Sequence, residues 1–290
     1  MPSGSSAEAP ASGALQGSAE RGIPVPSPRS PLRPAPEQRE MLLIAGLAFF
    51  LNLVPGTGLQ WASARWGLAL SQALFIAGPT ALGIRWFYLD PAAVLPWRRP
   101  RASEIAAALV GTLGLNHLLT LYGAWQDRVF PTPDVLRTLF DGLFVYRGPI
   151  DFALLLAVFA LLPAVCEEML FRGFLQSGLV HLLEKPGMGI VASAVLFGLF
   201  HLDPWRFVGI TVLGLFLGYL RHATGSLLPC VVAHATNNIV SVSLAAAGRL
   251  EEGRVPGSAL TAVVAILLVG AAPLLLRPGR PPRDSAVSVL

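Results

Sequence analysis

Long apolar runs separated by short polar segments dominate the chain from Met41 onward. A helix needs about 20 residues to cross a hydrocarbon core about 30 Å thick, and an apolar run of that length is typical of a transmembrane helix. The pattern therefore predicts an all-α fold, a polytopic membrane bundle of about eight transmembrane helices. The predicted helices cover residues 41–62, 66–88, 104–124, 150–182, 187–202, 205–221, 227–247 and 258–276.

The two ends of the chain differ from this apolar region. Residues 1–40 are rich in Pro, Ser, Ala and Gly and contain no apolar run, which is typical of a disordered tail. Because no apolar core precedes Met41, we expect the first hydrophobic segment to act as an uncleaved anchor. The predicted organisation is a disordered cytoplasmic tail over 1–40, a transmembrane bundle over 41–276 and a C-terminal tail over 277–290.

Composition supports lipid as the solvent of this chain. Of 290 residues, 53% are hydrophobic and 13% are charged, whereas soluble domains carry about 25% charged residues. The formal net charge of +4 comes from scattered basic residues without a dense cluster, so we expect neither a nucleic-acid nor a nucleotide partner. Cys166 and Cys230 both lie in apolar segments, which predicts no disulfide framework.

The distribution of Lys and Arg between alternate loops indicates an orientation. More of them fall on the side of the N-terminus than on the opposite side, which favours both termini in the cytoplasm. We therefore predict a multi-pass protein of a bacterial-type inner (plasma) membrane. Residues 126–148 mix apolar and charged positions and are predicted to form an amphipathic helix on the outer interface, or a lid.

One predicted helix contains three charged residues, in the stretch AVCEEMLFRG. An ionised side chain at the centre of a membrane helix costs about 2.5–3.5 kcal/mol on insertion scales, so we expect these residues to face the bundle interior. Glu168 and Arg172 are four residues apart and share a helix face, which predicts a salt bridge. Glu167 points about 100° away and is predicted to be an unpaired, available carboxylate.

Two further apolar helices carry polar residues at a spacing of four. Phe197 and His201 share a face near the end of one helix, and His234 and Asn238 share a face of another. If these faces converge on Glu167, they form a polar pocket inside the bundle. Such a pocket contains a base for water and donors for an oxyanion, the groups that peptide hydrolysis needs.

These residues form three short motifs, E-E-x-x-x-R, F-x-x-x-H and H-x-x-x-N. The positions are Glu167, Glu168 and Arg172, then Phe197 and His201, then His234 and Asn238. In order and spacing they resemble the CAAX prenyl endopeptidase and bacteriocin-processing family (CPBP, or Abi), intramembrane proteases that include the eukaryotic Ras-converting enzyme. Residues 1–150 carry no motif of this family.

The resemblance implies an intramembrane endopeptidase with its catalytic core at about 150–247. Its substrate would be a membrane-associated or lipid-modified protein with a prenylated C-terminus, a bacteriocin-like leader or a C-terminal sorting segment, and the bilayer would be its second partner. In this interpretation Glu167 activates water, His201 holds the water or polarises the scissile carbonyl, and His234 and Asn238 position water and stabilise the oxyanion. The supporting residues would be Glu168, Arg172 and Phe197.

The sequence leaves the use of a metal open. A catalytic zinc needs three protein ligands and an open position, which Glu167, His201 and His234 could provide. No H-E-x-x-H pairing lies on one helix, so the pattern favours glutamate catalysis, with no cofactor strictly implied and Zn²⁺ as the alternative.

Two other classes of function compete with the protease. A proton-coupled transporter could use Glu167 and the histidines as a relay, although we find no convincing internal repeat. A non-catalytic binding protein of the same fold is disfavoured because every expected motif position is filled. Outside the motifs, Asn116 and His117 are expected to bond neighbouring helices, and Cys166 is expected to be a packing residue.

Overall fold

The computed structural model describes residues 32–248 and 259–276, with the side chains of 139–141 left out. Most residues in these ranges lie in helices joined by short turns, and an isolated β-bridge joins Arg33 to Leu89. The predicted all-α fold is confirmed for this part of the chain. Most of the predicted N-terminal tail, residues 1–31, and the whole predicted C-terminal tail, 277–290, lie outside the described residues.

The first two apolar runs form a helical hairpin with π-helical turns in each arm. The first arm comprises α1 (Gln38–Leu51), the π-helical segment η1 (Asn52–Gly56) and α2 (Thr57–Ala62). The second arm comprises α3 (Ala64–Ser71), η2 (Gln72–Ala77) and α4 (Gly78–Trp86), followed by the short α5 (Pro91–Val94). A π-helical turn holds one more residue than an α turn and shifts the side chains that follow it to a different face.

The next helix is longer than predicted. α6 runs over Ala102–Val129 and α7 over Asp134–Leu143, so the first residues of the predicted segment 126–148 belong to α6. The sequence of α7 separates apolar from polar residues on opposite faces, as expected for an amphipathic helix.

One continuous helical segment, Pro149–Leu183, contains the charged motif. It comprises α8 (Pro149–Leu156), η3 (Ala157–Leu161), α9 (Leu162–Glu168), η4 (Met169–Leu175) and α10 (Gln176–Leu183). Pro163 has no N–H to donate to the preceding turn, and it is the second residue after the widened turn η3. A second widened turn, η4, begins directly after Glu168, so α9 presents both glutamates between two changes of helical register.

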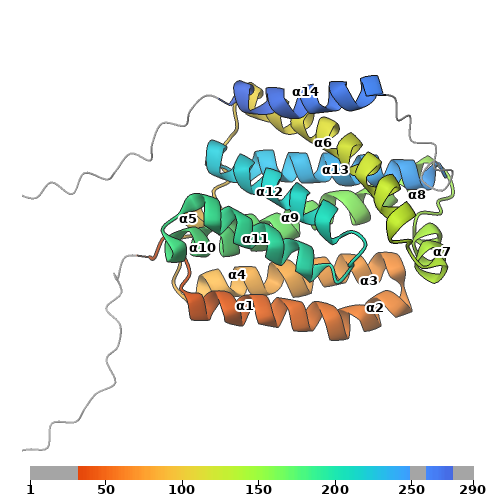
Figure 1. Ribbon diagram of the computed structural model, residues 1–290. Helices are drawn as coiled ribbons and strands as arrows, with labels where there is room; N and C mark the ends of the chain where they lie inside the picture. The colour runs from red at the N-terminus through yellow and green to blue at the C-terminus, as the bar shows by residue number, and fades with distance from the viewer. Residues whose placement is uncertain (1–31, 249–258, 277–290) are drawn as a thin grey trace, which may run out of the picture. The chain divides into compact units, whose positions relative to one another are not determined.

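The remaining helices are α11 (Pro186–Phe200), α12 (Phe207–Thr224), α13 (Leu228–Ala246) and α14 (Ala259–Leu275). α9 lies in the middle of the bundle, where it contacts η2 on one side and α13 on the other. α6 packs against α13 and α14, and α11 packs against α10 and α12 (Figure 1). This arrangement brings the helices of all three motifs together.

Six helices in the described residues are long and apolar enough to cross a membrane, by length and composition. These cover Gln38–Ala62, Ala64–Trp86, Ala102–Val129, Pro149–Leu183, Phe207–Thr224 and Leu228–Ala246. The other two predicted spans are present as the shorter apolar helices α11 and α14, of 15 and 17 residues. The multi-pass helical architecture is therefore supported, and the count of eight spans stays a prediction.

Two glycines of α6 test its packing against α14. A methyl group on Gly114 would lie 2.6 Å from the carbonyl oxygen of Ala265, whereas one on Gly123 would meet nothing within 4 Å. We expect Gly114→Ala to destabilise the protein by about 1–3 kcal/mol through overpacking. Gly123→Ala is the matched control and should be neutral or slightly stabilising, because Ala favours a helix over Gly. The measurement is the thermal unfolding midpoint in detergent, and equal midpoints for the two variants would contradict the α6–α14 contact.

Candidate active site

The structure brings all sequence-predicted site residues except Asn238 into one contiguous cluster. Glu167 and Glu168 end α9, Arg172 lies in η4, Phe197 and His201 lie at the end of α11, and His234 lies in α13. The π-helical turn η4 places Arg172 on the side of Glu168 that faces α12 and α11, since its contacts lie on those two helices.

Glu168 holds the most buried part of the cluster together. Its Oε1 atom lies 3.3 Å from Arg172 Nη1, which confirms the predicted ion pair, and 2.9 Å from His234 Nδ1, which was not predicted. The Glu168 and Arg172 side chains are fully buried and that of His234 nearly so. The carboxylate thus accepts a hydrogen bond from His234 and forms an ion pair with Arg172 away from solvent, where an unpaired charge would be strongly destabilising.

Arg172 and Phe197 extend the cluster to two more helices. Arg172 Nη2 donates a hydrogen bond to the carbonyl oxygen of Gly214 in α12, at 3.2 Å. The guanidinium carbon lies 4.4 Å from the centroid of the Phe197 ring, a cation–π contact. The same ring packs edge-on against both imidazoles, with centroids 4.9 Å from His201 and 5.6 Å from His234. Phe197 therefore sets the position of both histidines.

Both imidazoles are held through Nδ1. His201 Nδ1 lies 2.8 Å from the carbonyl oxygen of Phe197, which can only accept, so Nδ1–H is the donor. His234 Nδ1 faces the Glu168 carboxylate and is assigned as a donor for the same reason. A neutral ring with a proton on Nδ1 has a lone pair on Nε2. Both histidines therefore present Nε2 toward the rest of the site.

The two Nε2 atoms converge on the second glutamate. Glu167 Oε2 lies 4.0 Å from His201 Nε2 and 3.8 Å from His234 Nε2. The condition stated for a polar pocket, that the three helix faces converge, is therefore met for Glu167, His201 and His234. The side chain of His201 is 33% exposed, compared with 4% for His234, so the cluster opens beside His201.

Glu167 was expected to lack a cationic partner, but its carboxylate is not without a hydrogen bond. Gln72 Nε2 donates a hydrogen bond of 2.8 Å to Glu167 Oε1. Gln72 is the first residue of η2, in the part of the sequence before residue 150, which carries none of the motifs. The only sequence signal was a single carboxamide inside the apolar stretch SQALFIAG, and such a residue is often just a contact between helices.

Asn238 lies outside the cluster of hydrogen bonds. Its Oδ1 accepts from Asn237 Nδ2 at 3.2 Å, and Asn237 in turn accepts from Asn116 Nδ2 at 3.0 Å. Asn116 also donates to Ser241, so it bonds a neighbouring helix as expected. In the described part of the chain no hydrogen bond joins Asn238 to Glu167, His201 or His234.

Metal binding by this cluster finds no support in the side-chain groups of the described residues. Across the described ranges, no group of three His, Cys, Asp or Glu side chains is placed so that it could hold one. Glu167, His201 and His234, the predicted alternative ligands, approach each other in pairs at 3.8 and 4.0 Å without forming such a group. Cys166 and Cys230 are both buried and free, as predicted.

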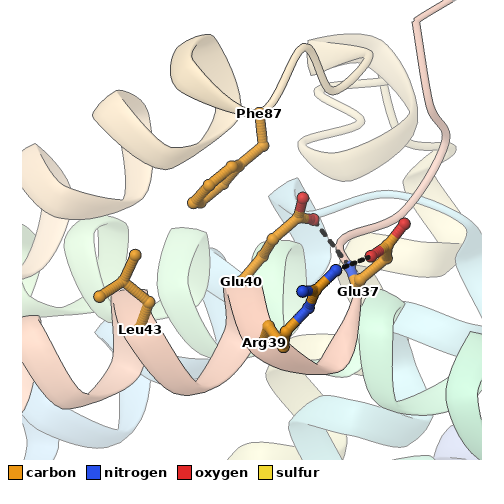
Figure 2. A pocket seen from close by; sticks show the side chains of 5 residues that line it. All are labelled: Glu37, Arg39, Glu40, Leu43 and Phe87. Atoms are coloured by element: carbon orange, nitrogen blue, oxygen red, sulfur yellow. Dashed lines mark hydrogen bonds and ion pairs between the residues drawn. The ribbon is translucent and has the colours of Figure 1, made fainter.

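A surface hollow of about 280 Å³ lies at the start of α1, and it shares no residue with the cluster. Figure 2 shows its lining side chains, Glu37, Arg39, Glu40, Leu43 and Phe87. Its charged groups already have partners within the protein. Arg39 pairs with Glu37 at 3.8 Å, and Glu40 caps the backbone N–H of Glu37.

The same end of the bundle is tied to the turn after α4 by Arg33. Its side chain donates to Glu40 and to the carbonyl oxygen of Phe87. The hydrogen bond to Glu40 raises the pKa of Arg33 above its ordinary value, so this side chain stays charged. The polar groups around this hollow therefore serve to join the start of α1 to the turn after α4.

Comparison with protein families agrees with the geometry. Residues 149–240 match the family described as type II CAAX prenyl endopeptidase, Rce1-like. This match supports assignment to the CAAX protease family. The matched segment contains every motif residue of the cluster, and the family points to a peptidase in a membrane. Gln72 lies outside the matched segment. Comparison with curated proteins and with solved structures gave no match.

The ion pair at the centre of the cluster can be tested by stability. Arg172→Met leaves the Glu168 carboxylate buried with less compensation, and we expect a loss of about 3–5 kcal/mol. Adding Glu168→Gln removes that carboxylate and should recover part of the loss. Arg99→Met, at an exposed arginine, is the control for loss of a positive charge. The readout is the unfolding midpoint in detergent; an Arg172→Met midpoint equal to that of Arg99→Met would show that the pair contributes nothing.

Proposed function

We propose that this protein is an intramembrane endopeptidase that uses Glu167 to activate water against a peptide bond of a membrane-associated or lipid-modified protein. The observation that supports this most strongly is the convergence of Glu167 Oε2 with two imidazole Nε2 atoms, at 4.0 and 3.8 Å. These distances are too long for direct hydrogen bonds, and each is short enough for one water oxygen to bond both the carboxylate and the imidazole.

The proposed reaction follows from which of these groups can accept a proton and which can donate one. Glu167 Oε2 takes a proton from water while the water oxygen bonds to the scissile carbonyl carbon, which gives a tetrahedral oxyanion. Glu167 then returns the proton to the amide nitrogen as the C–N bond breaks. One water is consumed, and the products are a carboxylic acid and an amine.

The histidines have different places in this scheme. His234, buried and fixed by Glu168, accepts the second proton of the water in a hydrogen bond and holds its oxygen toward the substrate. His201, at the opening, is placed to hold the water through its Nε2 lone pair or, with a proton on Nε2, to polarise the scissile carbonyl. Both roles use Nε2, because both Nδ1 atoms already have partners.

Asn238 is the proposed second oxyanion donor. Asn237 donates to Asn238 Oδ1, which leaves the Nδ2 protons of Asn238 available to a ligand. Asn238 lies one helical turn after His234 on α13, so its amide could meet a substrate held next to that imidazole. The substrate would be a prenylated C-terminus, a bacteriocin-like leader or a C-terminal sorting segment, and we propose a plasma membrane with both termini in the cytoplasm.

The test compares the wild type with Glu167→Gln and His201→Ala on a library of membrane-anchored peptides. A general base contributes about 10²–10⁴-fold, so Glu167→Gln should lower the cleavage rate by at least that range, with the fold retained. Glu104→Gln is the matched control, because Glu104 is a buried, ion-paired carboxylate outside the cluster. Metal content is measured on the same samples.

Two results would contradict the proposal. Unchanged cleavage by Glu167→Gln would remove the assigned base. Proton-linked flux by wild-type protein in liposomes, without cleavage of any peptide, would favour the transporter.

A further inference from the structure

Gln72 is the one member of the site contributed by the N-terminal half of the bundle among the described residues. Its side chain is buried, with 7% of the residue exposed, and its Nε2 atom donates to Glu167 Oε1 at 2.8 Å. It belongs to the span Ala64–Trp86, whereas the family match covers only residues 149–240.

The hydrogen bond from Gln72 constrains the carboxylate that the proposed reaction uses. A carboxylate on a flexible side chain can rotate about its last bond. With Oε1 held by Gln72, the plane of the group is fixed and Oε2 faces the imidazoles of His201 and His234. Because η2 packs against α9, the donor stands on a helix that is itself fixed against the helix of Glu167.

Two buried oxygens beside this hydrogen bond have no partner within the described residues. These are Gln72 Oε1 and Glu167 Oε2, one on each of the two bonded side chains. Burying an acceptor without a donor costs free energy, so a ligand with N–H or O–H donors suits this place. The attacking water and the N–H groups of a peptide are such donors.

An unpartnered oxygen alone does not mark a site in this protein. Gln176 is also a buried glutamine with an unpartnered Oε1, but its Nε2 donates to the backbone carbonyl of Gly218 at 3.0 Å. What distinguishes Gln72 is its partner, the carboxylate of Glu167. The two glutamines therefore form a natural pair of test and control.

We propose that Gln72 is a positioning residue of the active site, which orients Glu167 so that Oε2 faces the water and the two histidines. This rests on the proposed function, in which Glu167 is the base. A geometric displacement of a reacting group by about 1 Å can cost about 10²-fold in rate. Loss of the Gln72 hydrogen bond should therefore lower kcat while leaving substrate binding largely intact.

The experiment uses Gln72→Met, which keeps the length of the side chain and removes its N–H, on the full-length protein in detergent. We expect kcat to fall about 10- to 100-fold with KM changed less than about threefold. Gln176→Met should keep kcat within about threefold of the wild type. Wild-type kcat in Gln72→Met, or a fall of the same size in Gln176→Met, would overturn the proposal.

A double-variant cycle separates this proposal from the proposed function. In the Glu167→Gln background, adding Gln72→Met should have little further effect on rate, because positioning acts through Glu167. The unfolding midpoints of the wild type, the two single variants and the double variant can be compared in the same way, without a substrate. Non-additive changes in midpoint support the Gln72–Glu167 contact even if no peptide is cleaved. Additive changes overturn it. Loss of activity in Glu167→Gln but not in Gln72→Met would reject the positioning role and keep the protease.

Discussion

The structure depends on the neutralisation of one buried carboxylate, that of Glu168. An unpaired charge in this environment would cost several kcal/mol, so the helices that supply its partners must stay together. Arg172 and His234 both approach Oε1, and Arg172 also reaches the backbone of Gly214 and the ring of Phe197. The contacts of this ion pair thus join η4 to α11, α12 and α13, and the apolar faces of these helices pack around it.

This structural charge also determines the geometry of the proposed reaction. His234 has one ring nitrogen on Glu168 and the other toward Glu167, so the position of its Nε2 follows from the ion pair. Adjacent glutamates on a helix point about 100° apart, which allows one to be neutralised by Arg172 while its neighbour faces the opening. Replacing either glutamate alone would therefore disturb a different property, stability for Glu168 and chemistry for Glu167.

The sequence predicted the parts of this arrangement that depend on local spacing. Apolar runs located every long helix, and the four-residue step predicted the pair of Glu168 and Arg172. The sequence could not identify Gln72 as a site residue. Gln72 and Glu167 are 95 residues apart, and no regular spacing along the chain marks a contact between two such distant helices. Nor could the sequence assign the bond of His234 to Glu168, since the choice of ring nitrogen depends on how α13 is rotated. The span count stayed open because α11 and α14 are close to the minimum length.

The short length of α11 gives a physical account of how water could reach a hydrolytic site inside a bilayer. Its 15 residues rise about 22 Å, less than the hydrocarbon core of about 30 Å. α11 begins after Lys185, a residue type that suits a membrane interface; with Lys185 at one interface, the other end of the helix with His201 would lie within the depth of the membrane. Backbone without helical hydrogen bonds at that depth must be buried in protein or line a water-filled cavity. In that placement, the turn after His201 with Asp203 would line a hydrated opening, next to the one partly exposed side chain among the proposed base and its two histidines.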